Sequence, residues 1–242
     1  MKIVALIGSR ANPKGEEWLI GRHNLIEFPY TAACGSKYIG KKNTYISTNS
    51  RVLYTKLIDK VGKSNWISRP GPLATDRATD YDWISHALFS IKLMVGCPDL
   101  IVLLRQTTPL IDPDLIDRAI EEFQKHPVAT SLRSAHKLPE SPYKMFMREP
   151  HSDYWEPFMN IPLKDTNKPR QGFKDCYAPN GYVDILRPEV IDTGDVYGDK
   201  ILAFETPRVI EIDDKEALRE VELHVEDCPM WNSKFWKLAE VK

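Results

Sequence analysis

Short runs of consecutive apolar residues alternate along this chain with segments in which apolar residues recur every three or four positions. Ile3–Ile7 and Leu100–Leu104 are such runs, which are typical of strands buried on both faces of a parallel sheet. Apolar residues at helical spacing mark the segments Leu53–Val61, Trp83–Ile91 and Leu115–Phe123. This alternation predicts an α/β fold with a doubly wound, mostly parallel sheet of the Rossmann-like type.

The same patterns predict the remaining elements. Further strands are expected at Thr44–Thr48, Val128–Ser131, Tyr182–Leu186, Ile201–Phe204 and Val209–Ile212. Further helices are expected around Tyr30–Cys34 and from near Asp213. The helix that contains Trp83–Ile91 should begin near Asp76, and the one that contains Leu115–Phe123 should begin after the N-cap pair Asp112-Pro113.

Residues 135–175 interrupt this rhythm. The region is rich in Pro, Lys, Tyr and Met and has no clear periodicity, which predicts an insertion that leaves the sheet. The main domain would then comprise residues 1–134 and 176–242. Two groups of aromatic residues are expected to pack in an interface or to close the core: Tyr154, Trp155 and Phe158 in the insertion, and Trp231, Phe235 and Trp236 near the C-terminus.

Composition narrows the class of protein. The chain has 242 residues, long enough for a sizeable core, and a formal net charge of −1, which gives no global field to attract nucleic acid or an anionic membrane. Its four cysteines lack CxxC spacing, which favours free thiols in a reducing compartment over a metal or redox site. The N-terminal apolar run is too short for a signal peptide, and no stretch approaches the roughly 18 apolar residues that span a bilayer. We therefore expect a cytoplasmic protein.

Polar residues that follow the predicted strands are candidate site residues, because open parallel sheets bind ligands beyond the carboxyl ends of their strands. The segment 8–15 follows the first strand and offers Arg10, Lys14 and several backbone N–H groups, which suit a triphosphate. It matches neither the Walker A pattern nor GxGxxG. A solvated basic turn is the alternative interpretation.

Two later segments also carry candidate chemistry. Thr107 and Thr108, with Gln106, follow the strand at Leu100–Leu104 and suit a polyol, although hydroxyl capping of a strand-to-helix turn would give the same pattern. Glu211 and Asp213 would share one face of a strand, where two carboxylates and substrate phosphates can hold Mg²⁺. An exposed acidic strand end that caps the next helix is the alternative there.

The order of these segments resembles that of the CMP-sialic acid synthetases (acylneuraminate cytidylyltransferases) over almost the whole chain. The matching segments are Ser9–Gly15 with Asn24 (the family's ARxxSKG-type loop and its Lys-Asn end), Ile46–Asn49 (VSTD), Arg69–Ala78 (RPxxLAxDTA), Leu103–Leu110 (LLQPTSPL), Ser141–Lys144 (HPxK), Arg170-Gln171 with Asn180–Val183 (RQ…NGAIY) and Glu211–Leu218 (DIDxxxDL).

The resemblance implies an Mg²⁺-dependent enzyme that makes a CMP-sugar and pyrophosphate from CTP and an acidic sugar of the sialic-acid type, and a homodimer built by the insertion. It assigns nucleotide binding to Ser9, Arg10, Ala11, Lys14, His23, Asn24, Arg69 and Asp76, with Arg10, Lys14 and Asp213 catalytic. It assigns the acceptor to Arg105, Thr107, Thr108 and Asn180, joined across a dimer by Lys144, Arg170 and Gln171. It assigns Mg²⁺ to Glu211 and Asp213.

Departures from the family pattern leave alternatives open. Arg105 stands where the family has glutamine, so the acceptor could be another nonulosonic acid, Kdo or a small phosphonate. The family's lysine before Asn24 is replaced by His23 or Arg22, and its first metal aspartate by Glu211. These last changes would also suit a CTP-binding protein of the same fold without catalytic activity.

Overall fold

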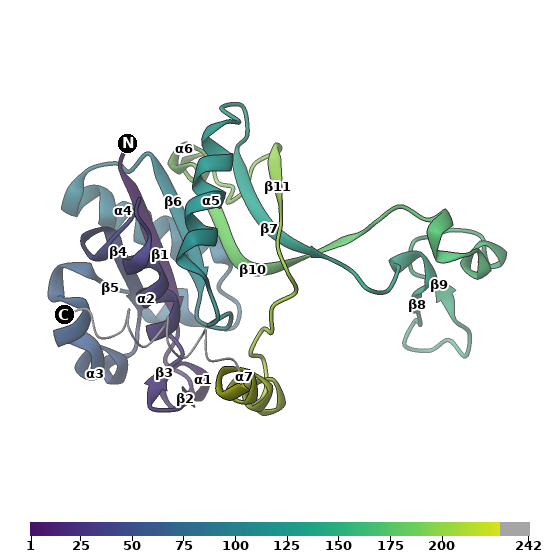
Figure 1. Cartoon of the computed structure of the whole chain (residues 1–242), viewed down its shortest axis with the longest axis horizontal. Helices are drawn as coiled ribbons and strands as arrows, with labels where there is room; N and C mark the ends of the chain where they lie inside the picture. The colour runs from purple at the N-terminus through teal and green to yellow at the C-terminus, as the bar shows by residue number, and fades with distance from the viewer. Residues whose placement is uncertain (228–242) are drawn as a thin grey trace.

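The computed structural model describes residues 1–227, so the predicted aromatic group Trp231, Phe235 and Trp236 lies outside the described residues (Figure 1). Its central sheet has seven strands in the spatial order β11-β7-β10-β6-β1-β4-β5. These strands are β1 (Ile3–Ser9), β4 (Thr44–Thr48), β5 (Trp66–Ser68), β6 (Leu100–Arg105), β7 (Ser131–Lys137), β10 (Tyr177–Leu186) and β11 (Ile201–Glu205).

The smaller elements surround this sheet. Two two-stranded sheets pair β2 (Leu19–Ile20) with β3 (His23–Asn24) and β8 (Phe146–Met147) with β9 (Glu156–Pro157). The α-helices are α1 (Pro13–Glu16), α2 (Glu27–Gly35), α3 (Arg51–Val61), α4 (Asp80–Val95), α5 (Pro113–Gln124), α6 (Pro188–Asp192) and α7 (Lys215–Asp227). Within residues 1–227, no helix is long and apolar enough to cross a membrane.

The direction of the strands confirms the predicted doubly wound α/β fold. β1 pairs in parallel with β4 and β6, β4 pairs in parallel with β5, and β7 with β11. β10 runs antiparallel to both of its neighbours, β6 and β7. From β1 the chain adds β4 and β5 on one side and then returns to add β6 on the other. This reversal is the switch point where α/β sheets bind ligands.

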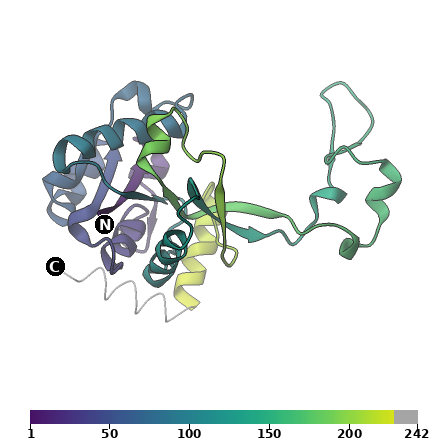
Figure 2. The same cartoon turned by 90° about the horizontal axis from the view of Figure 1, so that it is seen from above.

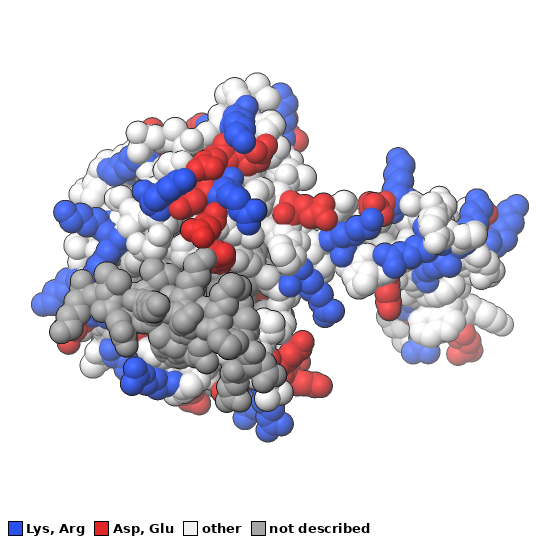
Figure 3. Space-filling view, in the orientation of Figure 1, with Lys and Arg blue, Asp and Glu red and all other residues white. Residues whose placement is uncertain are grey.

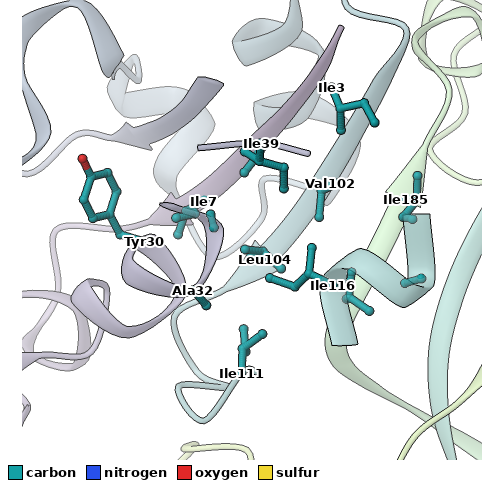
Figure 4. Packing of buried hydrophobic residues seen from close by; sticks show 14 of the residues in the cluster. Ile3, Ile7, Tyr30, Ala32, Ile39, Val102, Leu104, Ile111, Ile116 and Ile185 are labelled. Atoms are coloured by element: carbon teal, nitrogen blue, oxygen red, sulfur yellow. The ribbon is translucent and has the colours of Figure 1, made fainter. Parts of the chain in front are cut away.

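Helices cover both faces of the sheet, and alternate residues of β1 show why (Figure 2). Ile3 and Ile7 belong to a core that includes side chains of α2, α3 and α5 (Figure 4). Val4 and Leu6 pack in a second core with α4 and α6. Because both faces are buried, the strand is a continuous apolar run. Full burial of each such side chain contributes about 1.5–3 kcal/mol relative to exposure.

The start of α4 differs from the sequence prediction. Thr79 and Asp82 form a capping box, in which the Asp82 amide donates to Thr79 Oγ1 at 3.3 Å and the Thr79 amide donates to Asp82 Oδ2 at 2.7 Å. The helix therefore begins at Asp80, and the prediction of a start near Asp76 was wrong. The consequence for the site is a loop, residues 69–79, that is free to line a cavity beside the sheet.

Two predicted strands also differ. β7 begins only at Ser131, since the Ala129 amide donates to the His126 carbonyl in a turn and Val128 is 73% exposed. Val209–Ile212 is not a strand, because it joins no ladder of the sheet. Ile212 is nevertheless fully buried, since it packs in the cluster formed by α7 and the β2–β3 hairpin. The apolar residues of this segment serve that contact and not a strand.

Residues 138–176 leave the sheet between β7 and β10 and form an arm that projects away from the body (Figures 1 and 2). Large apolar side chains are exposed on the arm, among them Tyr154 (79%), Trp155 (62%) and Phe158 (55%). Lys and Arg side chains are also spread over the arm on the face shown in Figure 3. An exposed group of large apolar residues of this kind is typical of an interaction surface.

Candidate active site

A cavity of about 320 Å³ lies at the carboxyl ends of β1 and β6, at the switch point of the sheet. We call it the first cavity. Its walls are the segment 8–15, predicted to bind a triphosphate and called the phosphate loop below, the loop before α4 and the end of β6. Its lining residues are Gly8, Ser9, Arg10, Asn12, Lys14, Arg69, Leu73, Thr75, Asp76, Ala78, Asp80, Trp83, Leu104, Arg105, Gln106, Thr107 and Asp213.

The loop after β1 is held in a tight, specific shape. Asn12 caps the single turn of α1, and its Oδ1 accepts a hydrogen bond from the Gly15 amide at 2.7 Å. A Cβ at position 15 would lie 2.2 Å from the Arg10 carbonyl oxygen, so only glycine fits. Asn49 Oδ1, at the end of β4, accepts from the Ala11 amide at 2.8 Å. This loop directs two cations, Arg10 and Lys14, to the cavity.

Both cations are paired with exposed carboxylates. Arg10 Nη1 lies 2.8 Å from Asp76 Oδ1, and Lys14 Nζ lies 2.9 Å from Asp213 Oδ1. The side chains of Asp76 and Asp213 are 100% and 73% exposed. Ion pairs this exposed contribute about 0–1 kcal/mol. An anionic ligand could therefore replace either carboxylate at little cost.

A third cation, Arg69, is buried in the wall of the cavity. Its Nη2 donates to the Ser47 carbonyl at 2.7 Å, and its guanidinium stacks 4.6 Å from the ring centroid of Trp83. Burial and the nearby Arg10 lower the pKa of Arg69 to about 10, which leaves it charged at neutral pH. Gly8 makes room for this pair, since a Cβ there would lie 2.8 Å from Trp83 Cη2.

A fourth cation, Arg105, stands at the end of β6 opposite Gly8 of β1. Its Nη2 donates to Asp80 Oδ2 at 3.0 Å and lies 3.9 Å from Asp184 Oδ2. Despite its burial, these two carboxylates raise the pKa of Arg105. Gly181, at φ +60°, provides space for this side chain, because a Cβ there would lie 2.7 Å from Arg105 Cδ. Within residues 1–227 the guanidinium makes no other hydrogen bond, so it retains free donors.

The two carboxylates beside Arg105 respond differently to their surroundings. Burial acts to raise the pKa of Asp80, but Arg105 and the Trp83 indole lower it below its ordinary value. Asp184 is 1% exposed, and burial raises its pKa in spite of Arg105 and Arg133. Asp80 is therefore the firmer anionic partner, and Arg105 is fixed at the cavity wall by it.

Eight of the predicted site residues line the first cavity: Ser9, Arg10, Lys14, Arg69, Asp76, Arg105, Thr107 and Asp213. The other predicted residues do not line it. They are Ala11, His23, Asn24, Thr108, Lys144, Arg170, Gln171, Asn180 and Glu211.

The residues outside the cavity have other local roles. His23 and Asn24 lie in the β2–β3 hairpin, where His23 contacts Glu27 and Asn24 Oδ1 accepts from the Ile26 amide. Thr108 is buried and donates to the Asn180 carbonyl at 3.4 Å.

The arm residues lie away from the first cavity within one chain. Arg170 and Gln171 line a separate hollow at the base of the arm with Lys137, and Arg170 donates to the Leu138 carbonyl. Lys144 is exposed in a short 3₁₀ turn of the arm. The structure therefore brings none of these three to the site in the single chain.

The predicted metal pair is divided. Asp213 lines the first cavity, whereas Glu211 lines a neighbouring cavity of about 620 Å³ and accepts a hydrogen bond from Thr107 Oγ1 at 3.3 Å. The expectation that they share one strand face was wrong, because this segment is not a strand. Within the part of the chain that the structure describes, no three His, Cys, Asp or Glu side chains cluster to hold a metal by themselves.

Sequence reasoning missed Asp80 and Trp83 as site residues, whereas it noted Gln106 beside Thr107 and Thr108. Trp83 was assigned only to the apolar stripe of a helix, which it does join, but its ring also stacks on Arg69. Gln106 is 8% exposed, and its buried Oε1 has no hydrogen-bond partner within residues 1–227. Its position directly after a buried strand, at the ligand-binding end of the sheet, is the signal that pointed to it.

No known protein-family model matches the chain, and no curated protein matches its sequence. Solved structures do share its fold. CMP:2-keto-3-deoxy-manno-octonic acid synthetase, solved with CTP, is 14% identical with a TM-score of 0.68, over 94% of this chain and 100% of that one. The 4-diphosphocytidyl-2C-methyl-D-erythritol synthase of Anaerococcus prevotii is 11% identical with a TM-score of 0.64, over 93% and 96%.

A cytidylyltransferase from Leptospira borgpetersenii is also similar, at 16% identity and a TM-score of 0.56, over 100% of this chain and 93% of that one. The TM-scores establish a common nucleotidyltransferase-like fold, and identities this low establish no more than the fold. They leave the activity to be argued from the site.

Proposed function

We propose that this protein is a cytidylyltransferase, which transfers CMP from CTP to a hydroxyl group of an acidic sugar and releases pyrophosphate. One observation carries the proposal: four cations, Arg10, Lys14, Arg69 and Arg105, surround a single cavity in a chain whose net charge is −1. Asp76, Asp80 and Asp213 also line the cavity, but Asp76 and Asp213 are exposed partners that an anion can replace. The cations would then be available to two anionic substrates held side by side. The fold that the chain shares with a synthetase solved with CTP and with a protein named as a cytidylyltransferase adds support.

Arg10 and Lys14 would bind the triphosphate, exchanging Asp76 and Asp213 for phosphate oxygens. Negative charge spreads over those oxygens as the acceptor hydroxyl attacks the α-phosphorus, and fixed cations stabilise it there. The Arg69–Trp83 wall would face the base and the ribose. Its rigidity supports this role, because Arg69 is held by Ser47 and by the indole ring.

Arg105 would bind the anionic group of the acceptor. Its position supports this, since it is the register partner of Gly8, the first residue of the phosphate loop. Thr107 lines the same end of the cavity and can donate to a sugar hydroxyl. A cation in this position favours an acceptor whose carboxylate lies close to the reacting hydroxyl, as in sialic acid, other nonulosonic acids and Kdo.

The residues present fit Mg²⁺, which prefers oxygen ligands, keeps several waters and is bound through one or two carboxylates with substrate phosphates. Asp213 would hold it, because its exposed carboxylate lines the cavity and faces Lys14. Glu211 would act through Thr107, to which it is hydrogen bonded. When bound, the ion would neutralise phosphate charge and acidify the attacking hydroxyl.

The arm would form a homodimer in which Lys144, Arg170 and Gln171 reach the partner's acceptor site. The exposed Tyr154, Trp155 and Phe158 support this assembly. Light scattering at micromolar concentration should give about twice the mass of 27.8 kDa. Trp155→Glu should shift the protein towards the monomer, whereas Asn167→Glu, a polar position on the arm, should not. A monomeric wild-type protein would refute the dimer.

Nucleotide preference is the direct test of the proposed function. In thermal shift with Mg²⁺, CTP at 100 times its Kd should stabilise the protein by about 2.7 kcal/mol, a rise of roughly 5 °C or more. ATP, GTP, UTP and dTTP should give smaller shifts. Pyrophosphate release with a panel of acidic and neutral sugars would then identify the acceptor. Equal stabilisation by ATP would overturn the choice of CTP, and CTP binding without turnover on any acceptor would favour a non-catalytic protein.

A further inference from the structure

A second cavity of about 410 Å³ lies between the first turn of α3 and the edge strand β5. It shares no lining residue with the first cavity. Its lining residues are Thr48, Asn49, Ser50, Arg51, Tyr54, Lys63, Trp66, Ile67 and Ser68. The volume is within the range of small-molecule sites, about 300–1,000 Å³.

One wall of the second cavity is aromatic. The rings of Tyr54 and Trp66 meet edge to face, with centroids 5.5 Å apart and planes at 70°. Tyr54 is 39% exposed, so much of its ring faces outward, and Trp66 is only partly buried. Two rings at this angle present both a face and an edge, which suits contact with a further planar ring.

The rim of the second cavity is positively charged. Arg51 and Lys63 line it, and no carboxylate does. Neither side chain forms a hydrogen bond or an ion pair with any residue from 1 to 227. In the first cavity Arg10, Lys14 and Arg105 each have a carboxylate partner. The two cations here are uncompensated and would attract an anion without displacing a protein group.

We propose that the second cavity is a separate binding site for an aromatic anion, a planar ring that carries a phosphate or carboxylate group. The ring contacts Tyr54 and Trp66, and the anionic group is held by Arg51 and Lys63. Nucleoside monophosphates have this chemistry and fit the volume. The site does not depend on the reaction assigned to the first cavity.

The second cavity lies directly behind the loops of the first. Asn49 lines the second cavity and accepts from the Ala11 amide of the phosphate loop at 2.8 Å. The Arg69 amide, in the wall of the first cavity, donates to the Thr48 carbonyl at 2.9 Å. A ligand at the second site therefore contacts residues that position both loops.

The test is a titration of the full chain with AMP, followed by tryptophan fluorescence. The chain has six tryptophans, so Trp66→Phe identifies the part of the signal that comes from the second site. Wild-type protein should show saturable quenching that Trp66→Phe largely removes. Adenosine, which lacks the anion, and ribose 5-phosphate, which lacks the ring, should each bind at least ~10-fold more weakly, because each loses one of the two contacts.

Charge reversal then locates the anion. Arg51→Glu and Lys63→Glu should each weaken AMP binding at least ~10-fold, as expected when a ligand charge loses its counter-charge. Lys42→Glu is the matched control, since Lys42 is exposed and lines neither cavity. Quenching that survives Trp66→Phe, or affinity that neither reversal changes, would overturn the proposal. CTP binding at the first cavity is measured separately by thermal shift, so failure of one site is distinguishable from failure of the other.

Discussion

Asp80 Oδ2 accepts a hydrogen bond from Arg105 Nη2 at 3.0 Å, and this pair joins the start of α4 to the end of β6. The other oxygen of the same carboxylate, Oδ1, accepts from Trp83 Nε1 at 3.0 Å, and the Trp83 ring stacks on Arg69. One carboxylate thus connects the two cationic sides of the first cavity. Its charge fixes Arg105, whereas its contact with Trp83 needs only an acceptor oxygen.

Asp80→Asn separates these two contacts. The amide oxygen can still accept from the indole, but the NH₂ group cannot accept from Arg105. We expect the KM for the acceptor to rise by about 10-fold, the loss of roughly one charge-assisted hydrogen bond, and the KM for CTP to change little. Steady-state kinetics with each substrate varied in turn measures both. Asp192→Asn, in an exposed pair with Lys92, is the control. Equal losses for both substrates would show that Asp80 does not act through Arg105.

Gly8→Ala tests the wall of the cavity. The added Cβ would lie 2.8 Å from Trp83 Cη2 and 3.0 Å from Arg69 Nη2, and both neighbours are held by other contacts. Overpacking of this kind costs about 1–3 kcal/mol, and displacement of Arg69 should weaken nucleotide binding by about 10-fold or more. Chemical denaturation and nucleotide titration measure the two effects. Gly71→Ala is the matched control, because a Cβ there meets nothing within 4 Å. Similar behaviour of the two variants would contradict the assignment.

Glu27 gives a prediction about pH. Glu27 is partly buried at the start of α2. Its partial burial acts to raise its pKa, but hydrogen bonds and charge from Lys60 and the Asn24 amide lower that pKa below the ordinary 4.5. A lowered pKa in the folded state stabilises the protein above the unfolded value, and this contribution is lost as the pH falls through the folded value.

Glu27→Gln should therefore reduce the free energy of unfolding by about 2 kcal/mol at pH 7, the usual contribution of a hydrogen bond to a charged group. The difference from wild type should stay constant down to about pH 4.5 and shrink below it. Urea denaturation at several pH values measures this. A difference that does not depend on pH would show that lost packing, rather than lost charge, causes the effect.

The continuous apolar runs that became β1 and β6 could be predicted because burial on both faces leaves no polar position in them. The N-cap of α5 could also be predicted, since Asp112 accepts from the Asp114 amide and Pro113 takes the first helical position. These features depend on neighbouring residues alone. The carboxyl ends of the same strands pointed to the loop after β1 and to Thr107, which line the first cavity, whereas the family resemblance pointed to Arg105.

Features that depend on distant residues could not be predicted. Asn24 matched a family motif, but its side chain is 3% exposed in a hairpin that packs with α7 and Ile212. The pattern of Val209–Ile212 indicated a strand, yet within residues 1–227 no strand of the sheet pairs with this segment. The role of Asp80 depends on Arg105, 25 residues later in the chain. No local pattern reveals that pairing.

Asp213→Asn tests the catalytic assignment most directly. The side chain is 73% exposed and pairs with Lys14 at the surface, so its loss should change the free energy of unfolding by no more than about 0.5 kcal/mol. Asparagine keeps the shape and loses the charge that would neutralise Lys14 and hold Mg²⁺. We expect kcat to fall at least ~100-fold, comparable to the loss of one transition-state electrostatic contact. The kcat of Glu211→Gln should fall less than that of Asp213→Asn, because Glu211 lies outside the first cavity and reaches it through Thr107. Pyrophosphate release measured over a range of Mg²⁺ concentrations compares the two variants with wild type. Normal turnover by Asp213→Asn at saturating Mg²⁺ would mean that the metal is held elsewhere.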